Sequence, residues 1–315
     1  MVGTVILFFA GGAVVAFSLS VTCICFFRIF YSKKRRPLGE DEFETFDGEA
    51  YDPHRENMVA LMREIRAMPY IDVSLVSYDE LSLRGKYYEY QKGAPVEILF
   101  HGYRGSGERD FCGIMFNSLA MGHNVLMVDN RASGRSEGKV ITFGAKESID
   151  CLSWIDFVIS EIDKDAEIFI TGVSMGAATV MNASGYELPK NVVGIIADCG
   201  FTSTKAIIKK VMRDKRLPAN VFYPFARIGA IVFGHFDPER ISPIKSMKKC
   251  RVPIIFFHGD ADSFVPCYMS VENFEACASS QKRLVITHGA DHGLCFPHDM
   301  EGYFYEVKTF FEGAV

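Results

Sequence analysis

Hydrophobic residues along most of the chain occur in short uninterrupted runs, separated by stretches in which they recur at helical spacing. The runs predict eight strands, at 71–77, 81–90, 96–100, 124–128, 167–171, 192–197, 253–257 and 283–287. The intervening stretches predict helices near 55–67, 110–121, 145–161, 175–185, 267–277 and 299–311. Short, continuously apolar strands that alternate with helices are typical of a parallel sheet covered on both faces. The first two strands lie close enough together to predict a hairpin.

One connection, over residues 201–236, is too long for a single crossover helix, and we expect an inserted cap there. Its aromatic residues are Phe222, Tyr223, Phe225 and Phe233, and its basic residues are Lys205, Lys209, Lys210, Arg213, Lys215, Arg216 and Arg227. Two interpretations stay open. The cap is an amphipathic helix with a solvated basic face, or that face meets anionic headgroups or an anionic substrate while the aromatics line an acyl pocket.

The N-terminal segment has a different pattern, because residues 3–27 contain no charged side chain. As a helix, this run of 25 residues would span about 37 Å, enough to cross a bilayer with some tilt. A cleaved signal peptide, or a lipoprotein signal at Cys23, normally has basic residues before the apolar run, and none precedes it here. We therefore predict an uncleaved transmembrane anchor at 3–31, a basic and then acidic linker at 32–52, and a catalytic domain at 53–315.

Basic residues flank only the C-terminal side of the predicted anchor, at Arg28, Lys33, Lys34, Arg35 and Arg36. Positively charged flanks are retained in the cytoplasm, so the predicted localisation is a single-pass membrane protein with a cytoplasmic catalytic domain. The cysteines agree, because an odd number without a disulfide-like pattern suits a reducing compartment better than an oxidising one. They are Cys23, Cys25, Cys112, Cys151, Cys199, Cys250, Cys267, Cys277 and Cys295.

The composition excludes several classes of protein. Of the 315 residues, 49% are hydrophobic and 23% are charged, which excludes an intrinsically disordered chain. A formal net charge of −5 gives no indication of nucleic-acid binding. The sequence contains no H-E-x-x-H motif, no phosphate-binding P-loop and no dinucleotide fingerprint, so we expect no metal and no cofactor. The oligomeric state is not indicated.

The strongest chemical motif follows the fifth predicted strand. Residues 168–171 lead directly into Gly172-Val173-Ser174-Met175-Gly176, and a helical stretch follows. This strand, G-x-S-x-G and helix order is typical of a nucleophile elbow, in which a strained turn presents the serine hydroxyl above the sheet. Small neighbours are required so that strand and helix can approach each other. The Met175 backbone N–H would then point at a developing oxyanion.

A second G-x-S-x-G pattern, at residues 134–138, provides an internal comparison. No strand leads directly into it and no helix begins directly after it. Its serine, Ser136, is therefore rejected as a nucleophile.

A serine nucleophile needs a base and a carboxylate that orients the base. Two late strands end in suitable residues, with Asp260 and Asp262 after one and His288 and His292 after the next. His298 is a further candidate base. His258, Asp260 and Asp262 could in principle bind a metal, but their close spacing on one loop is weak evidence for a site.

These motifs identify a resemblance over residues 71–311. The chain resembles α/β-hydrolases of the serine-hydrolase type, and is similar to bacterial membrane-anchored members of the branch with dienelactone hydrolase-like and prolyl oligopeptidase-like enzymes. The motifs are His101-Gly102-Tyr103, Gly172-Val173-Ser174-Met175-Gly176, Asp262-Ser263-Phe264-Val265-Pro266 and Ala290-Asp291-His292-Gly293. The extra glycines that lipases carry after the first motif are absent.

The resemblance implies an α/β-hydrolase fold with a mostly parallel eight-stranded sheet, helices on both faces, a helical cap and an N-terminal transmembrane helix. It also implies that Asp262 is the acid, that His292 is the base, and that the Tyr103 backbone N–H completes the oxyanion hole beside Met175. His101 and His258 are expected to be structural.

The predicted function is a serine hydrolase that cleaves a carboxylic ester through an acyl-enzyme at Ser174. The predicted partner is a small-molecule or lipid-like ester. A serine peptidase or amidase could use the same machinery, although an aminopeptidase needs acidic groups and the cap is basic. A third hypothesis is a non-catalytic binding protein of the same fold, against which the complete set of Ser174, Asp262 and His292 argues.

Overall fold

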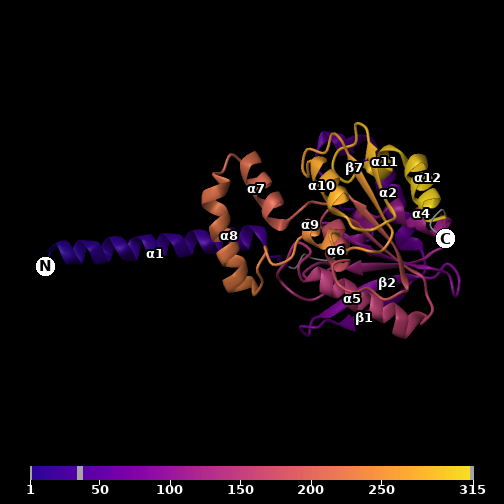
Figure 1. The fold of residues 1–315 in the computed structure, drawn as a ribbon, viewed down its shortest axis with the longest axis horizontal. Helices are drawn as coiled ribbons and strands as arrows, with labels where there is room; N and C mark the ends of the chain where they lie inside the picture. The colour runs from indigo at the N-terminus through magenta and orange to yellow at the C-terminus, as the bar shows by residue number, and fades with distance from the viewer. Residues whose placement is uncertain (1, 34–37, 313–315) are drawn as a thin grey trace.

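A computed structural model of the chain describes residues 2–33 and 38–312, with the backbone alone for residues 2–14. The predicted basic positions Lys34, Arg35 and Arg36 lie outside the described residues. Figure 1 shows a sheet covered by helices on both sides, with helix α1 extending away from it.

The sheet has eight strands in the order β1-β2-β4-β3-β5-β6-β7-β8. The strands are β1 (Ile71–Val76), β2 (Ser82–Tyr88), β3 (Val96–Phe100), β4 (Asn124–Asp129), β5 (Ile168–Val173), β6 (Val192–Asp198), β7 (Ile254–Gly259) and β8 (Lys282–Thr287). β1 and β2 form the predicted hairpin, β2 pairs antiparallel with β4, and all other neighbours are parallel. The predicted mostly parallel, eight-stranded sheet is confirmed.

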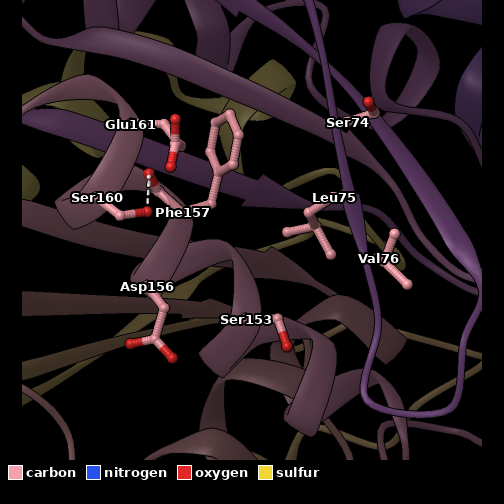
Figure 2. Close-up of a pocket in the computed structure, with 8 residues that line it drawn as sticks. All are labelled: Ser74, Leu75, Val76, Ser153, Asp156, Phe157, Ser160 and Glu161. Carbon is pink, nitrogen blue, oxygen red and sulfur yellow. Dashed lines mark hydrogen bonds between the residues drawn. The ribbon is translucent and has the colours of Figure 1, made fainter.

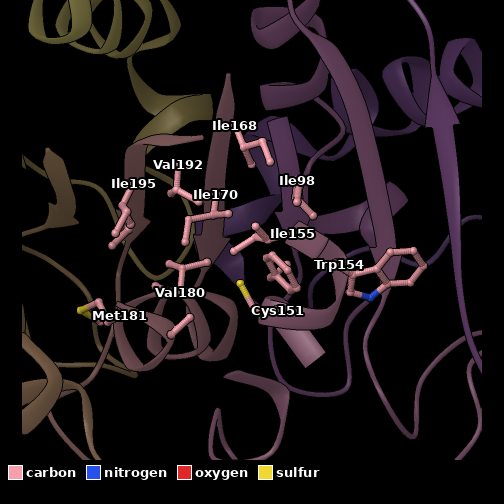
Figure 3. Close-up of a cluster of buried hydrophobic side chains, with 14 of the residues drawn as sticks. Ile98, Cys151, Trp154, Ile155, Ile168, Ile170, Val180, Met181, Val192 and Ile195 are labelled. Carbon is pink, nitrogen blue, oxygen red and sulfur yellow. The ribbon is translucent and has the colours of Figure 1, made fainter. Parts of the chain in front are cut away.

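Two hydrophobic cores lie on the two faces of the sheet. On one face, α5 (Glu147–Phe157) and α6 (Met175–Ala183) pack against the strands, and Trp154 and Val180 are buried there (Figure 3). On the other face lie α2 (Asp52–Ala67), α4 (Ile114–Ala120) and α12 (Met300–Glu312). Because the central strands are covered on both faces, their sequences are continuous apolar runs rather than alternating ones.

Several further helices are short or connect the main elements. They are η1 (Glu49–Tyr51), α3 (Gly107–Asp110), η2 (Val158–Ile162, a π-helical continuation of α5), α9 (Pro243–Met247), α10 (Tyr268–Ala276) and α11 (Cys295–His298). The helix predicted near 110–121 begins only at Ile114, as α4, with Gly113 directly before it, and Asp110 instead ends the short helix α3. A Cβ at Gly113 would lie 2.1 Å from the Phe296 ring and would require that ring to move, and glycine is a poor helix former.

The segment between β6 and β7 contains two helices, α7 (Thr204–Asp214) and α8 (Ala219–Gly234), inside the range predicted for the cap. The predicted bounds of the linker and of the catalytic domain stay predictions. Several basic side chains of this segment are paired with nearby acids: Lys205 with Glu239, Lys210 with Asp214, and Arg227 with Asp237. Part of the basic charge is therefore neutralised within the segment itself.

Helix α1 (Val2–Ile29) ends against α8, as Figure 1 shows. Phe26 and Phe30 at this end are buried, and the Phe26 ring lies 5.4 Å from the ring of Phe233. The two helices approach closely at Gly229, where a Cβ would lie 3.0 Å from both the Thr22 carbonyl oxygen and the Phe26 Cβ.

The prediction for the N-terminal segment needs correction. Across the residues that the structure describes, no helix combines the length and the apolar character needed to cross a membrane. This finding contradicts the predicted localisation, a single-pass membrane protein with a cytoplasmic catalytic domain, and the predicted anchor at residues 3–31 is not supported. Part of the apolar character has another physical reason, because Phe26, and Phe30 just beyond the run, pack into the protein's own core beside α8 and Phe143.

Candidate active site

Ser174 occupies a sharp turn between β5 and α6. Its backbone has φ 58° and ψ −111°, a strained conformation for a residue with a side chain. Glycines on both sides permit the turn. A Cβ at Gly176 would lie 1.6 Å from the Phe100 carbonyl oxygen, and one at Gly172 would lie 2.2 Å from the Gly176 backbone. The turn therefore has the geometry that the sequence pattern predicts for a nucleophile elbow.

The three side chains singled out by the sequence form one hydrogen-bonded chain. His292 Nε2 lies 2.9 Å from Ser174 Oγ, and His292 Nδ1 lies 2.7 Å from Asp262 Oδ2. A carboxylate can only accept hydrogen bonds, so Nδ1 carries the proton that it donates to Asp262. Nε2 of the neutral ring is then free to accept from the Ser174 hydroxyl.

Asp262 is held as an ionised carboxylate. Burial by itself would raise its pKa, but the hydrogen bonds from His258 and His292 outweigh burial and hold the pKa well below its usual range. Its other oxygen accepts from the backbone N–H groups of Phe264 and Val265 at 2.9 and 2.7 Å. A carboxylate that stays ionised can stabilise positive charge on the adjacent imidazole.

The competing acid and base form a separate pair outside the buried site. Asp260 Oδ2 lies 2.7 Å from His288 Nδ1, and the His288 side chain is 88% exposed. His298, at the end of α11, is also exposed. The structure therefore brings Asp262 and His292 to Ser174, and does not bring Asp260, His288 or His298 there.

The loop after β3 runs beside Ser174. A Cβ at Gly102 would lie 3.5 Å from the Ser174 Cβ, and the Gly102 N–H donates to Asp110 Oδ2 at 2.7 Å. Tyr103 follows in this loop, and its hydroxyl donates to the Ile29 carbonyl oxygen at 2.7 Å. On the other side of Ser174, Met175 is the first residue of α6, and a first-turn N–H has no partner inside its helix.

Two histidines near the site have structural contacts. The buried His101 accepts from the Asn130 backbone N–H at 3.2 Å and has Nδ1 2.8 Å from the Gly102 carbonyl oxygen. The buried His258 lies behind Asp262, with Nε2 3.2 Å from Asp262 Oδ2 and Nδ1 2.6 Å from Ser270 Oγ. The sequence singled out His258 as a structural residue without indicating that it contacts the carboxylate that orients His292.

Ser136, in the second G-x-S-x-G pattern, has a structural environment. Its hydroxyl donates to the Asp129 carbonyl oxygen at 2.6 Å and accepts from the Arg84 backbone N–H at 2.8 Å. With its hydroxyl committed to the backbone and no histidine among these partners, Ser136 lacks the environment of an activated nucleophile.

One possible metal-binding group is present among the residues that the structure describes. Ligand atoms of Cys199, Asp262 and His292 lie within 4.8 Å of one another. Burial raises the pKa of Cys199 well above its usual value, so its thiol stays protonated and is a poor ligand. The arrangement therefore fits a hydrogen-bonded acid–base site better than a metal site.

Asp198 is a buried carboxyl at the end of β6 that the sequence pattern did not single out. Its Oδ1 has no hydrogen-bond partner among the described residues. Burial raises the pKa of Asp198 to about 6, although a hydrogen bond from Cys295 and the nearby His258 and His292 oppose this. The Asp198 backbone carbonyl oxygen accepts from the Ser174 N–H at 2.8 Å, and the charge of its side chain interacts with His258, His292 and Asp262.

We expect this raised pKa to give a measurable pH dependence of stability. The folded chain binds a proton at Asp198 below about pH 6, whereas the unfolded chain binds it only near 3.8. Wild-type stability should therefore gain a contribution as the pH falls through this window, up to about 3 kcal/mol. Asp198→Asn lacks that contribution.

Urea unfolding of wild type and of Asp198→Asn at several pH values measures the difference between their free energies of unfolding. The free energy of unfolding of Asp198→Asn, relative to wild type, should be higher at pH 7 than at pH 4.5. A difference that stays constant over this range would contradict the assignment.

Two hollows lie away from these residues. One of about 480 Å³ lies between β1, at the edge of the sheet, and α5 with its π-helical continuation (Figure 2). The other, of about 370 Å³, lies between α2, α4 and the start of α12, and is mostly apolar. Ser174, Asp262 and His292 line neither of them. The candidate site instead lies at the carboxyl ends of β5, β7 and β8, the usual place for an active site in an open parallel sheet.

Comparisons with known proteins point to one fold. Residues 95–226 match a family model described as the alpha/beta hydrolase fold. Among relatives, the chain is 26% identical over 195 residues to Bacillus subtilis YqkD, covering 62% of this chain and 64% of YqkD. It is 24% identical over 227 residues to Schizosaccharomyces pombe bem46, covering 70% and 69% of the two chains.

A solved structure agrees over a larger part of the chain. The Pyrococcus furiosus esterase Pf2001 superposes with a TM-score of 0.67 at 21% identity, covering 90% of this chain and 97% of the esterase. These comparisons do not test the predicted dienelactone hydrolase-like and prolyl oligopeptidase-like branch, which stays a prediction.

Proposed function

Because this chain has the fold of the α/β-hydrolase superfamily, we propose that it is a serine hydrolase that cleaves carboxylic esters. The observation that carries the proposal is the hydrogen-bonded chain from Ser174 through His292 to Asp262, beside the free N-terminus of α6. A serine activated in this way is a nucleophile for acyl groups.

In the first half of the proposed reaction, Ser174 Oγ attacks the ester carbonyl carbon while His292 Nε2 takes the hydroxyl proton. Asp262, kept ionised by its hydrogen bonds, stabilises the positive charge that forms on His292. The N–H groups of Met175 and Tyr103 hold the negative oxygen of the tetrahedral intermediate. Collapse breaks the bond to the leaving alcohol, which takes the proton from His292, and the acyl group stays on Ser174.

In the second half, a water molecule attacks the acyl-enzyme and gives a proton to His292 Nε2. The second tetrahedral intermediate collapses by breaking its bond to Ser174 Oγ, which takes that proton back. The products are the free carboxylic acid and the resting enzyme. All proton transfers use Ser174, His292, the leaving alcohol and water, so the proposed reaction requires no cofactor.

The surroundings of His292 support a small-molecule ester as substrate. The Phe264 ring lies 5.1 Å from the His292 ring and is 42% exposed, so it offers apolar surface beside the base. Lys210 of α7 donates to the Ser263 carbonyl oxygen, which places α7 against the loop that carries Asp262. The name of the similar Pyrococcus furiosus protein, an esterase, supports an ester rather than an amide bond.

A panel of p-nitrophenyl esters of increasing acyl length, measured beside aminoacyl anilides, tests the bond type. We expect turnover of the esters, with negligible turnover of the anilides. Efficient hydrolysis of anilides alone would indicate a peptidase or amidase. Turnover of neither class, by protein whose Ser174 also fails to react with a fluorophosphonate, would indicate a non-catalytic binding protein.

A further inference from the structure

We propose that Tyr51, which precedes the sheet in the chain, is a positioning residue for His292. The inference rests on the proposed function and adds a residue from η1 to the site. The Tyr51 hydroxyl donates to the His292 backbone carbonyl oxygen at 2.6 Å, across 241 positions of the sequence.

The loop that carries His292 needs such a contact. The carbonyl oxygen that Tyr51 binds belongs to the peptide between His292 and Gly293, and Gly293 has φ +67°. Gly289, three residues before His292, has φ +78°. Glycine has no Cβ to restrict its backbone, so its neighbouring peptides can rotate more freely than those of other residues. A hydrogen bond on the carbonyl fixes a peptide plane that sterics alone leave loose.

Apart from the contact of its Nε2 with Ser174, the hydrogen bonds of His292 described so far come from the loops after β7 and β8. Its ring is held by Asp262, and its N–H donates to Asp291 Oδ1 at 2.7 Å. The same Asp291 oxygen accepts from the Ser263 N–H at 2.8 Å, which ties these two loops to each other. Ser174 contacts the ring of His292 from outside both loops, whereas Tyr51 binds its backbone from outside them and so helps to fix the histidine loop relative to the rest of the protein.

Tyr51 is itself held firmly. Its ring stacks on Phe46 with centroids 4.8 Å apart, and the Arg109 guanidinium lies 4.1 Å from the Phe46 ring centroid. Arg109 Nε donates to Asp110 at 2.7 Å, and Asp110 accepts from the Gly102 N–H in the loop beside Ser174. The segment before α2 is therefore linked to the histidine loop and to the proposed oxyanion loop.

The hydroxyl is in the correct protonation state to donate. Burial raises the pKa of Tyr51, and the negative charge of Asp291 raises it further. The Tyr51 hydroxyl therefore keeps its proton over the whole range in which the protein would act.

The test is Tyr51→Phe, which removes the hydroxyl and keeps the ring that stacks on Phe46. The readout is inactivation of the full-length protein by a fluorophosphonate over a range of probe concentrations. This gives separately the limiting rate of phosphonylation at Ser174 and the probe concentration at half that rate. We expect the limiting rate to fall about tenfold, since a small misplacement of a catalytic group is costly, while the half-saturating concentration stays unchanged.

Ser118→Ala is the matched control. The buried Ser118 hydroxyl also donates to a backbone carbonyl oxygen, that of Ile114 at 3.0 Å, but it lies in α4 away from Ser174. Loss of a buried hydrogen bond should lower the melting temperature of both variants. Ser118→Ala should nevertheless keep the wild-type limiting rate of phosphonylation. Tyr51→Leu, which removes the ring as well, should react no faster than Tyr51→Phe.

The outcomes separate this inference from the function on which it rests. A folded Tyr51→Phe protein that is phosphonylated at the wild-type limiting rate overturns the role of Tyr51 and leaves the proposed hydrolase intact. A reduced rate in Ser118→Ala of the same size would also overturn it, since the effect would then be general. Wild-type protein that does not react at Ser174 refutes the proposed function itself.

Discussion

Ser174→Ala should abolish covalent labelling by a fluorophosphonate and lower kcat for the best ester substrate on the order of a millionfold. The reason is chemical, because alanine has no atom that can form the acyl bond or share a proton with His292. The residual rate should reflect only binding and the oxyanion groups. Protein mass spectrometry of the labelled wild type should place the phosphonyl group on Ser174.

Ser136→Ala provides a control within the same chain, because Ser136 belongs to the other G-x-S-x-G pattern. Within the described part of the chain, its hydroxyl bonds to the backbone of Asp129 and Arg84, so this variant should be labelled like wild type. Labelling that persists in Ser174→Ala would refute the proposed nucleophile. Labelling lost in Ser136→Ala, with the protein still folded, would refute it as well.

The turn at Ser174 could be predicted from sequence because its causes are local. The strand, the turn and the helix are contiguous, and the atoms that exclude a Cβ at Gly172 belong to Gly176 and to Ala177 directly after the motif, although Gly176 itself is constrained by Phe100 of β3. The parallel sheet could also be predicted, since strands buried on both faces leave apolar runs that are visible in a single sequence.

The support around the site could not be predicted, because it depends on contacts between distant segments. Tyr51 lies in a segment that resembles an acidic linker, and nothing in that segment indicates that its hydroxyl reaches His292. Asp198 lies at the end of an apolar strand, where its burial depends on neighbouring strands and on Cys295. Periodicity identifies elements, but it does not identify which side chains meet when the elements pack.

The N-terminal run shows a second limit of hydrophobic patterns. Such a pattern indicates that side chains leave water, but not what covers them. Phe26, and Phe30 just beyond the run, are covered by α8 and Phe143, whereas Phe17 and Leu19 are exposed. Gly229, the residue that lets the two helices approach, lies about 200 positions away in sequence and cannot be linked to the run by inspection.

Asp262→Asn should lower kcat about ten-thousandfold and leave the fold intact. An asparagine side chain can donate to His292 Nδ1, which would move the ring proton to Nε2, where the base must accept the Ser174 proton. The amide also carries no charge to stabilise the imidazolium, whereas the hydrogen bonds from His258 and His292 hold the pKa of Asp262 low enough to keep its carboxylate ionised.

The matched control is Asp260→Asn, two residues earlier in the same loop, where the carboxylate pairs with the exposed His288. That variant should keep kcat within about twofold of wild type, because surface ion pairs contribute little. Ester hydrolysis by the purified variants, with melting temperatures measured alongside, decides between the two carboxylates. If Asp260→Asn loses the activity and Asp262→Asn keeps it, then Asp260 is the orienting acid and the buried chain of hydrogen bonds has another purpose.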